Sequence, residues 1–255
     1  MNICLALLGL WMFASHGNEP LQSVRSKNIS DKEVYDTTFL IKRSKDTIYN
    51  GVDYHFFYNV YIDTNRNSKN HQLLGDFLFT QDQNIDAYNE RIKKRKIALS
   101  KIPLDDLPRE WVPLYLYKNK YYVYKPSDLG NLGRRIVSDS LLMFWFVDGP
   151  MPYVLQSVSK KDNDTWEIRS KDYFVRMEGF IRPEILNIYI IDKENRIAVW
   201  EYKSETEKKF NYELYIPKEN IKNFDMIVNE SDSKMPEFDF DQPDFKKLLR
   251  KKTGK

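Results

Sequence analysis

Apolar and polar residues alternate most regularly at residues 52–63. The even positions of this stretch are all aromatic or β-branched, namely Val52, Tyr54, Phe56, Tyr58, Val60 and Ile62. A period of two predicts a β-strand that buries one face. The polar residues 64–70 predict a loop, and the apolar run at residues 73–79 predicts a second strand.

One helix is predicted, at residues 84–101. Four apolar residues recur there at helical spacing and share one face, namely Ile85, Tyr88, Ile92 and Leu99. Asn84 is a suitable N-cap, and Pro103 and Pro108 follow the helix because proline cannot continue it.

From Trp111 to Val228 the chain is mainly β in character. Short apolar runs alternate with polar turn sequences, which predicts about nine strands spaced about 8–12 residues apart. The turn Lys118-Asn119-Lys120 predicts a tight hairpin, because Asn tolerates a positive φ. Short turns between neighbouring strands predict an antiparallel meander, which forms either a β-barrel or a β-sandwich.

A meander of this kind with one helix is similar in architecture to the lipocalin-like barrels. The G-x-W signature that opens the first lipocalin strand is absent from the strands predicted here. The similarity therefore implies a barrel shape and does not assign a function.

The run Leu141 to Val147 is apolar on both of its alternating faces. A strand with one face in water would alternate with polar residues instead. We therefore expect another element to cover its second face, and we predict that the helix at 84–101 does so.

The N-terminus resembles a secretory signal. Residues 1–18 contain no charged side chain, and residues 3–14 are apolar. This run is shorter than the roughly 20 residues needed for a membrane span, and small residues precede Asn18. We expect cleavage after residue 17 and a secreted or periplasmic protein. The alternative is a buried N-terminal helix or strand.

The remaining domain boundaries follow from composition. Residues 18–33 are a polar lead-in, and residues 34–228 form one β-rich domain with an N-terminal strand and helix portion. Residues 229–255 form a tail that is first acidic and then basic. The basic end could contact an anionic membrane surface peripherally, but we expect no membrane span.

Charge and cysteine content exclude several functions. The net charge of the 255 residues is +3, and six of the 40 basic residues lie in the last eleven positions. Residues 18–244 therefore carry 34 basic against 37 acidic residues, which does not favour nucleic-acid binding. The one cysteine, Cys4, lies in the predicted signal, so the mature chain would hold neither disulfides nor thiolate metal sites.

Residues 63–68 (Asp-Thr-Asn-Arg-Asn-Ser) resemble the start of a calcium loop. The match fails at Ser68, where glycine is needed, and at Leu74, where a bidentate carboxylate is needed. We therefore assign no metal and no cofactor.

No sequence motif identifies a catalytic residue. The chain lacks the common nucleophile, phosphate-loop and zinc motifs, and only His55 and His71 would remain as bases after cleavage. The 37 acidic residues provide many carboxylate pairs without singling one out. We assign no catalytic residue, and we leave open an exported carbohydrate hydrolase that uses two carboxylates.

Aromatic residues are the main indication of function. Six of them in predicted strands are candidate ligand-binding residues, namely Tyr115, Tyr117, Tyr122, Tyr124, Trp145 and Trp200. Exposed rings would stack on sugars, and inward rings would line a cavity for an apolar ligand. The alternative is ordinary core packing, since aromatic residues are common in strands. The expected function is non-catalytic binding of a small apolar ligand, a glycan or a partner protein, and a further alternative is an envelope-associated structural or interaction protein.

Overall fold

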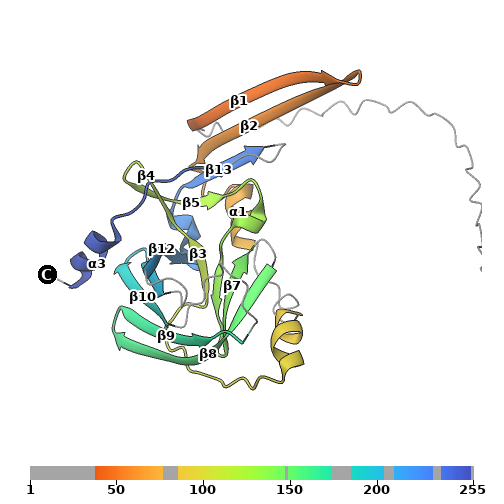
Figure 1. The fold of residues 1–255 in the computed structure, drawn as a ribbon. Coiled ribbons are helices and arrows are strands. Elements are labelled where there is room, and N and C mark those ends of the chain that lie inside the picture. The colour runs from red at the N-terminus through yellow and green to blue at the C-terminus, as the bar shows by residue number, and fades with distance from the viewer. Residues whose placement is uncertain are drawn as a thin grey trace, which may run out of the picture. The chain divides into compact units, whose positions relative to one another are not determined.

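The computed structural model describes residues 38–76, 86–146, 149–173, 185–203, 210–231 and 237–253. The predicted signal peptide and polar lead-in lie outside the described residues. The described chain is mainly β and contains a closed barrel and a second sheet (Figure 1).

The barrel has eight strands, and every neighbouring pair is antiparallel. They are β3 (Glu110–Pro113), β6 (Arg135–Val137), β7 (Leu141–Phe146), β8 (Gly149–Asp162), β9 (Thr165–Lys171), β10 (Ile185–Asp192), β11 (Ile197–Lys203) and β12 (Phe210–Pro217). Strands β6 to β12 pair in chain order, and β3 closes the barrel between β12 and β6. The predicted antiparallel meander is confirmed, and it forms a barrel rather than a sandwich.

The second sheet has five strands in the order β1-β2-β13-β5-β4. Its members are β1 (Thr38–Tyr49), β2 (Val52–Asp63), β4 (Tyr115–Tyr117), β5 (Lys120–Lys125) and β13 (Met226–Ser231). Strands β13 and β5 are parallel, and the other pairs are antiparallel. Both hairpin turns have two consecutive residues with positive φ, Asn50-Gly51 and Lys118-Asn119, as the right-handed twist of paired strands requires. The predicted hairpin around Asn119 is confirmed.

The helical segments within the described ranges are short. They are α1 (Lys69–Asp76), η1 (Tyr88–Ile92), η2 (Lys93–Arg95), η3 (Leu129–Asn131), η4 (Lys218–Asn223) and α3 (Phe245–Thr253). The prediction of a strand at 73–79 is wrong for the residues that the structure describes, because residues 73–76 belong to α1. The helix predicted at 84–101 ends early, because Lys96 has a φ of 55° and the chain is not helical beyond it. No helix among the described ranges is long and apolar enough to span a membrane.

Large aromatic side chains fill the inside of the barrel. Trp111, Trp166, Trp200, Phe144 and Tyr215 are almost completely buried in one cluster. The rings of Trp111 and Trp200 meet edge to face at 5.4 Å. The barrel is therefore a packed core along much of its length.

Both faces of β7 are covered, as predicted. Leu142 and Phe144 point into the barrel core, whereas Leu141 and Met143 pack with Ile92 of η1 in a separate cluster. The helical segment thus shields the outer apolar face of β7 from water.

A third cluster joins the barrel to the second sheet. It contains Leu74 of α1, Val112 of β3, Ile216 of β12, Val123 of β5 and Met226 of β13. The opposite face of the second sheet carries a fourth cluster, which is rich in tyrosine. The second sheet is therefore apolar on both faces.

Candidate functional site

A pocket of about 330 Å³ lies beside the end of β3 and the start of β6. Most of its lining comes from three segments far apart in sequence, within residues 113–116, 212–215 and 240–245, and Asn131, Gly133 and Arg135 complete it. Its volume is at the lower end of the range for small-molecule sites.

Many contacts hold Arg135 in place. Its side chain is only 5% exposed, and its Nη1 donates hydrogen bonds to the backbone oxygens of Gly133 (2.8 Å) and Arg134 (3.0 Å). Its Nη2 donates to Glu213 Oε2 (3.4 Å), and the guanidinium lies 4.1 Å from the centre of the Phe144 ring. Burial lowers the pKa of Arg135, but four acidic groups around it (Tyr215, Glu213, Tyr202 and Tyr115) together raise it above its ordinary value, so the group stays charged.

Glu213 connects this buried charge to the pocket. Its Oε2 also accepts a hydrogen bond from the Tyr215 hydroxyl (2.8 Å), yet 36% of the side chain remains exposed. Burial raises the pKa values of Tyr202 and Tyr215, and the charge of Glu213 adds to this effect. Both phenols therefore remain neutral donors beside a fixed carboxylate.

Two stacked aromatic pairs contribute to the lining of the pocket. Tyr115 stacks on Phe240 with ring centres 4.4 Å apart, and Tyr212 stacks on Phe245 at 5.4 Å. Tyr115 belongs to β4 and Tyr212 to β12, whereas Phe240 and Phe245 belong to the C-terminal segment. The pocket therefore exists only because the C-terminal segment packs against the sheets.

Backbone contacts fix that segment. Asp241 pairs with Leu116 as an isolated antiparallel bridge, and its N–H donates to the Leu116 oxygen (2.9 Å). Its carboxylate accepts a hydrogen bond from the N–H of Lys118 (2.6 Å). Beyond it, α3 packs Phe245, Leu248 and Leu249 against the cluster between barrel and sheet.

The structure separates the six aromatic residues that the sequence suggested. Tyr115, Tyr117, Tyr122 and Tyr124 pack together with Phe238 and Phe240 on the outer face of the second sheet. Trp200 is buried inside the barrel, and Trp145 is half-buried on β7, against the cluster that contains Ile92 of η1. Of the six, Tyr115 lines the pocket described above.

Sequence reasoning missed Arg135 and Glu213 as site residues. Each is a charged residue within a strand, and such residues usually face water. A usable signal was present for the C-terminal segment, because Phe238 and Phe240 alternate with acidic residues at a strand-like period of two.

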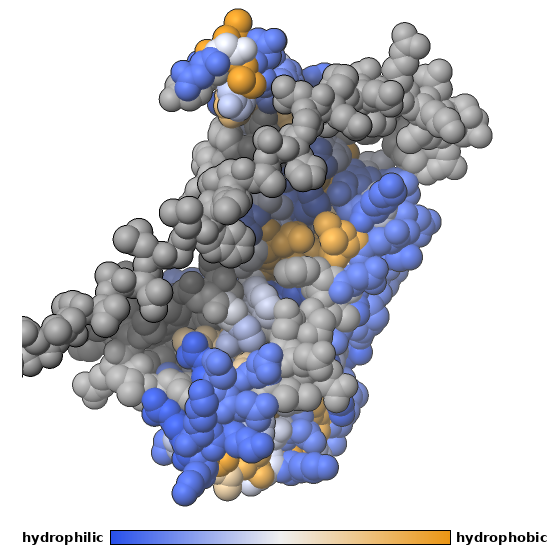
Figure 2. Space-filling view, turned by 90° about the vertical axis from the view of Figure 1, so that its right-hand side faces the viewer, coloured by the Kyte–Doolittle hydropathy of each residue, from blue (hydrophilic) through white to orange (hydrophobic). Residues whose placement is uncertain are grey.

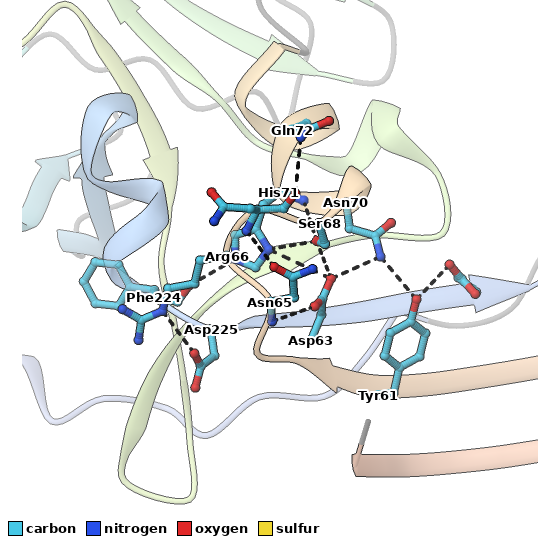
Figure 3. A network of polar contacts seen from close by, with 12 residues as sticks. Tyr61, Asp63, Asn65, Arg66, Ser68, Asn70, His71, Gln72, Phe224 and Asp225 are labelled. Atoms are coloured by element: carbon cyan, nitrogen blue, oxygen red, sulfur yellow. Dashed lines mark hydrogen bonds and ion pairs between the residues drawn. The ribbon is translucent and has the colours of Figure 1, made fainter. Parts of the chain in front are cut away.

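The loop that resembles a calcium site is a network of internal hydrogen bonds (Figure 3). Asp63 Oδ1 accepts from the N–H of Asn65 (3.0 Å), and Asn65 Oδ1 accepts from the N–H of Asn67 (3.0 Å). Ser68 caps α1, because its Oγ accepts a hydrogen bond from the N–H of His71 (3.2 Å). Among the described residues, no group of three or more His, Cys, Asp or Glu side chains could hold a metal ion.

The same network brings Ser68, His71 and Asp63 together, but not in the order of a catalytic triad. Ser68 lies in the middle, with its Oγ 2.6 Å from Asp63 Oδ2 and 3.2 Å from His71 Nδ1 (Figure 3). A triad needs the histidine in the middle, where it can take the serine proton and pass it on. Here His71 Nε2 lies 3.1 Å from the backbone oxygen of Phe224, so the histidine joins α1 to the end of η4.

Comparison with known proteins assigns no relative. No protein-family model, no curated protein and no solved structure matches the chain.

Proposed function

We propose that the protein is a non-catalytic binding protein that takes a small saccharide in the pocket beside β3 and β6. The observation that supports this most is Glu213, a partly exposed carboxylate that Arg135 and Tyr215 hold in the lining of a pocket with stacked aromatic walls. The chain's high content of strand aromatics, which first suggested ligand binding, is consistent with the proposal.

The chemistry of the pocket suits a polyhydroxylated ring. The apolar faces of a sugar pack on aromatic rings, and its hydroxyl groups donate to carboxylate and amide oxygens. Glu213 supplies the carboxylate, and Gln242 and Asn131 supply amides at the lining. A carboxylate that is already fixed loses little rotamer entropy when the ligand binds.

Isothermal titration calorimetry with a panel of mono- and disaccharides tests the proposal. We expect Glu213→Gln to weaken binding by about tenfold or more, because a charge-assisted hydrogen bond becomes a neutral one. Gln242→Ala removes an exposed side chain of the lining, so we expect weaker binding without a change in folding. The matched control is Glu167→Gln on β9, which removes the same charge outside the pocket and should leave binding unchanged.

Flat titrations with every saccharide would contradict the proposal. A hydrolase remains the competing function, because Asp241 and Glu213 both line the pocket and could act as two carboxylates. Release of reducing ends from an oligosaccharide, abolished by Glu213→Gln, would favour the hydrolase. The hydrogen bond from the Lys118 N–H to Asp241 supports a structural role for Asp241 instead.

We also propose that the protein is exported and loses residues 1–17. The uncharged apolar run at residues 3–14 supports this, and its length is typical of the core of a signal peptide. Intact-mass measurement of the full chain expressed in a secretion-competent host should give a product that begins at Asn18. An intracellular product that retains Met1 would contradict export.

A further inference from the structure

The hairpin of β1 and β2 extends beyond the rest of its sheet (Figure 1). Strand β13 pairs with β2 only from Tyr58 to Asp63, so residues 44–57 have no further strand beside them in the described sheet. This outer half of the hairpin carries exposed apolar residues, among them Val52 (53%), Tyr54 (42%) and Phe56 (39%). Figure 2 shows the projecting end at the top of the view, with hydrophobic residues among hydrophilic ones.

The register divides the hairpin into two different faces. Directly paired residues point to the same side of a sheet, and Lys45 pairs with Phe56 while Arg43 pairs with Tyr58. We call this side the aromatic face. It combines stacked Tyr54 and Phe56 rings with two cations. The acidic residues of the outer half, Asp46 and Asp53, lie on the opposite face, because they pair with His55 and Ile48.

A segment of the chain itself already packs on a surface of this kind. Further along the same side of the second sheet, Tyr58, Tyr122 and Tyr124 pack with Phe238 and Phe240. These two phenylalanines belong to the segment Glu237–Asp241, in which Phe alternates with acidic residues.

Two acidic side chains of that segment, Glu237 and Asp241, also accept hydrogen bonds from residues of the second sheet and its hairpin turn. Glu237 accepts a short hydrogen bond from the Tyr124 hydroxyl (2.5 Å), and Arg43 and Glu237 both lie close enough to affect the pKa of Tyr58. Burial raises this pKa, Arg43 lowers it and Glu237 raises it. Arg43 of the aromatic face and Glu237, the first residue of the internal acidic segment, thus both lie near Tyr58.

From this continuity and charge complementarity, we propose that the aromatic face is a docking surface for a partner protein. The partner would present an extended segment in which aromatic and acidic residues alternate. Its aromatic side chains would pack on Tyr54 and Phe56, and its carboxylates would pair with Lys45 and Arg43. The saccharide pocket is not part of this surface.

Fluorescence anisotropy with the full chain and a labelled peptide copy of residues 237–242 (Glu-Phe-Asp-Phe-Asp-Gln) tests the proposal. We expect Lys45→Glu to weaken peptide binding by about tenfold or more, because an attractive pair becomes a repulsive one. The matched control, Lys42→Glu, makes the same change on the opposite face of the same strand and should have little effect. Likewise, Phe56→Ser should abolish binding, whereas Ile48→Ser on the opposite face should not.

A peptide in which every acid is replaced by its amide should bind more weakly, and circular dichroism checks that each variant is folded. Binding that depends on Tyr117 but not on Lys45 would overturn the proposal, since the peptide would then only exchange with the internal segment. No binding of the peptide would overturn it too. Self-association that Phe56→Ser abolishes would instead assign the face to a second copy of the chain.

Discussion

Replacing Trp200 with alanine is expected to lower the free energy of unfolding by about 3–5 kcal/mol. Trp200 is fully buried inside the barrel, where its ring lies 4.8 Å from that of Tyr215 and 5.4 Å from that of Trp111. Its truncation leaves a cavity that these rings cannot fill, because both are fixed on other strands. Urea titration followed by circular dichroism measures the change.

Two further variants serve as comparisons for Trp200→Ala. Trp200→Phe retains most of the ring and should lose much less stability, so it serves if the alanine variant fails to fold. Phe210→Ala on β12 removes an aromatic side chain that is 51% exposed and should change stability by no more than about 0.5 kcal/mol. If Trp200→Ala left stability unchanged and lowered only ligand affinity, Trp200 would be a binding residue, as the sequence suggested.

Alkaline pH is expected to unfold the protein between about pH 10 and pH 12. Burial and the charge of Glu230 raise the pKa of Tyr61 to about 12, and burial and Glu201 do the same for Tyr189. Burial also raises the pKa values of Tyr115, Tyr124, Tyr202 and Tyr215.

The sign follows from proton binding in the two states. An unfolded tyrosine releases its proton near pH 10, whereas these folded tyrosines retain theirs, so the folded state binds more protons above pH 10. Stability is therefore complete below pH 10 and is lost as the pH rises, by up to about 1.4 kcal/mol per pH unit for each tyrosine. Burial of Arg134 lowers its pKa to about 9, which acts in the opposite direction but for one group only.

Urea unfolding at pH 8, 10 and 11 measures this loss, and absorbance at 295 nm follows the phenolates. Tyr189→Phe removes one of these groups and should make the pH dependence shallower. Phenolate absorbance that rises while circular dichroism stays native would contradict the prediction, because the tyrosines would then ionise inside the folded protein.

The fold class was predictable because strand periodicity and polar turns are local signals. The hairpin at Lys118-Asn119 and the cover over β7 both follow from patterns within a few residues. Strand β1 was not predicted, because Lys42, Arg43 and Lys45 interrupt its apolar pattern, although Asn50-Gly51 is a strong hairpin signal. Residues 73–76 were assigned wrongly, because the Ser68 cap decides in favour of a helix that is too short for its periodicity to be recognised.

The candidate site was not predictable in the same way. Whether Arg135 and Glu213 point into the barrel depends on how it closes, and closure is set by the pairing of β3 with β6 and β12. The pocket also needs residues 240–245, which lie more than 100 positions after Arg135. Such long-range arrangements leave no pattern within a window of a few residues.

The charged residues of β1, which interrupt its apolar pattern, also affect whether copies of the protein aggregate through this strand. A bare edge strand invites the same strand of another copy to pair with it and to start an aggregate. In an antiparallel two-fold pair, paired residues have the same parity, so a pair centred on Lys42, Arg43, Lys45 or Asp46 places that charge against itself. A pair centred on Ser44 places Arg43 against Lys45, but it also places Lys42 against Asp46, so repulsion and attraction offset each other. Four of the five central registers therefore place a charge against itself, and the edge of β1 resists templating copies of itself in those registers.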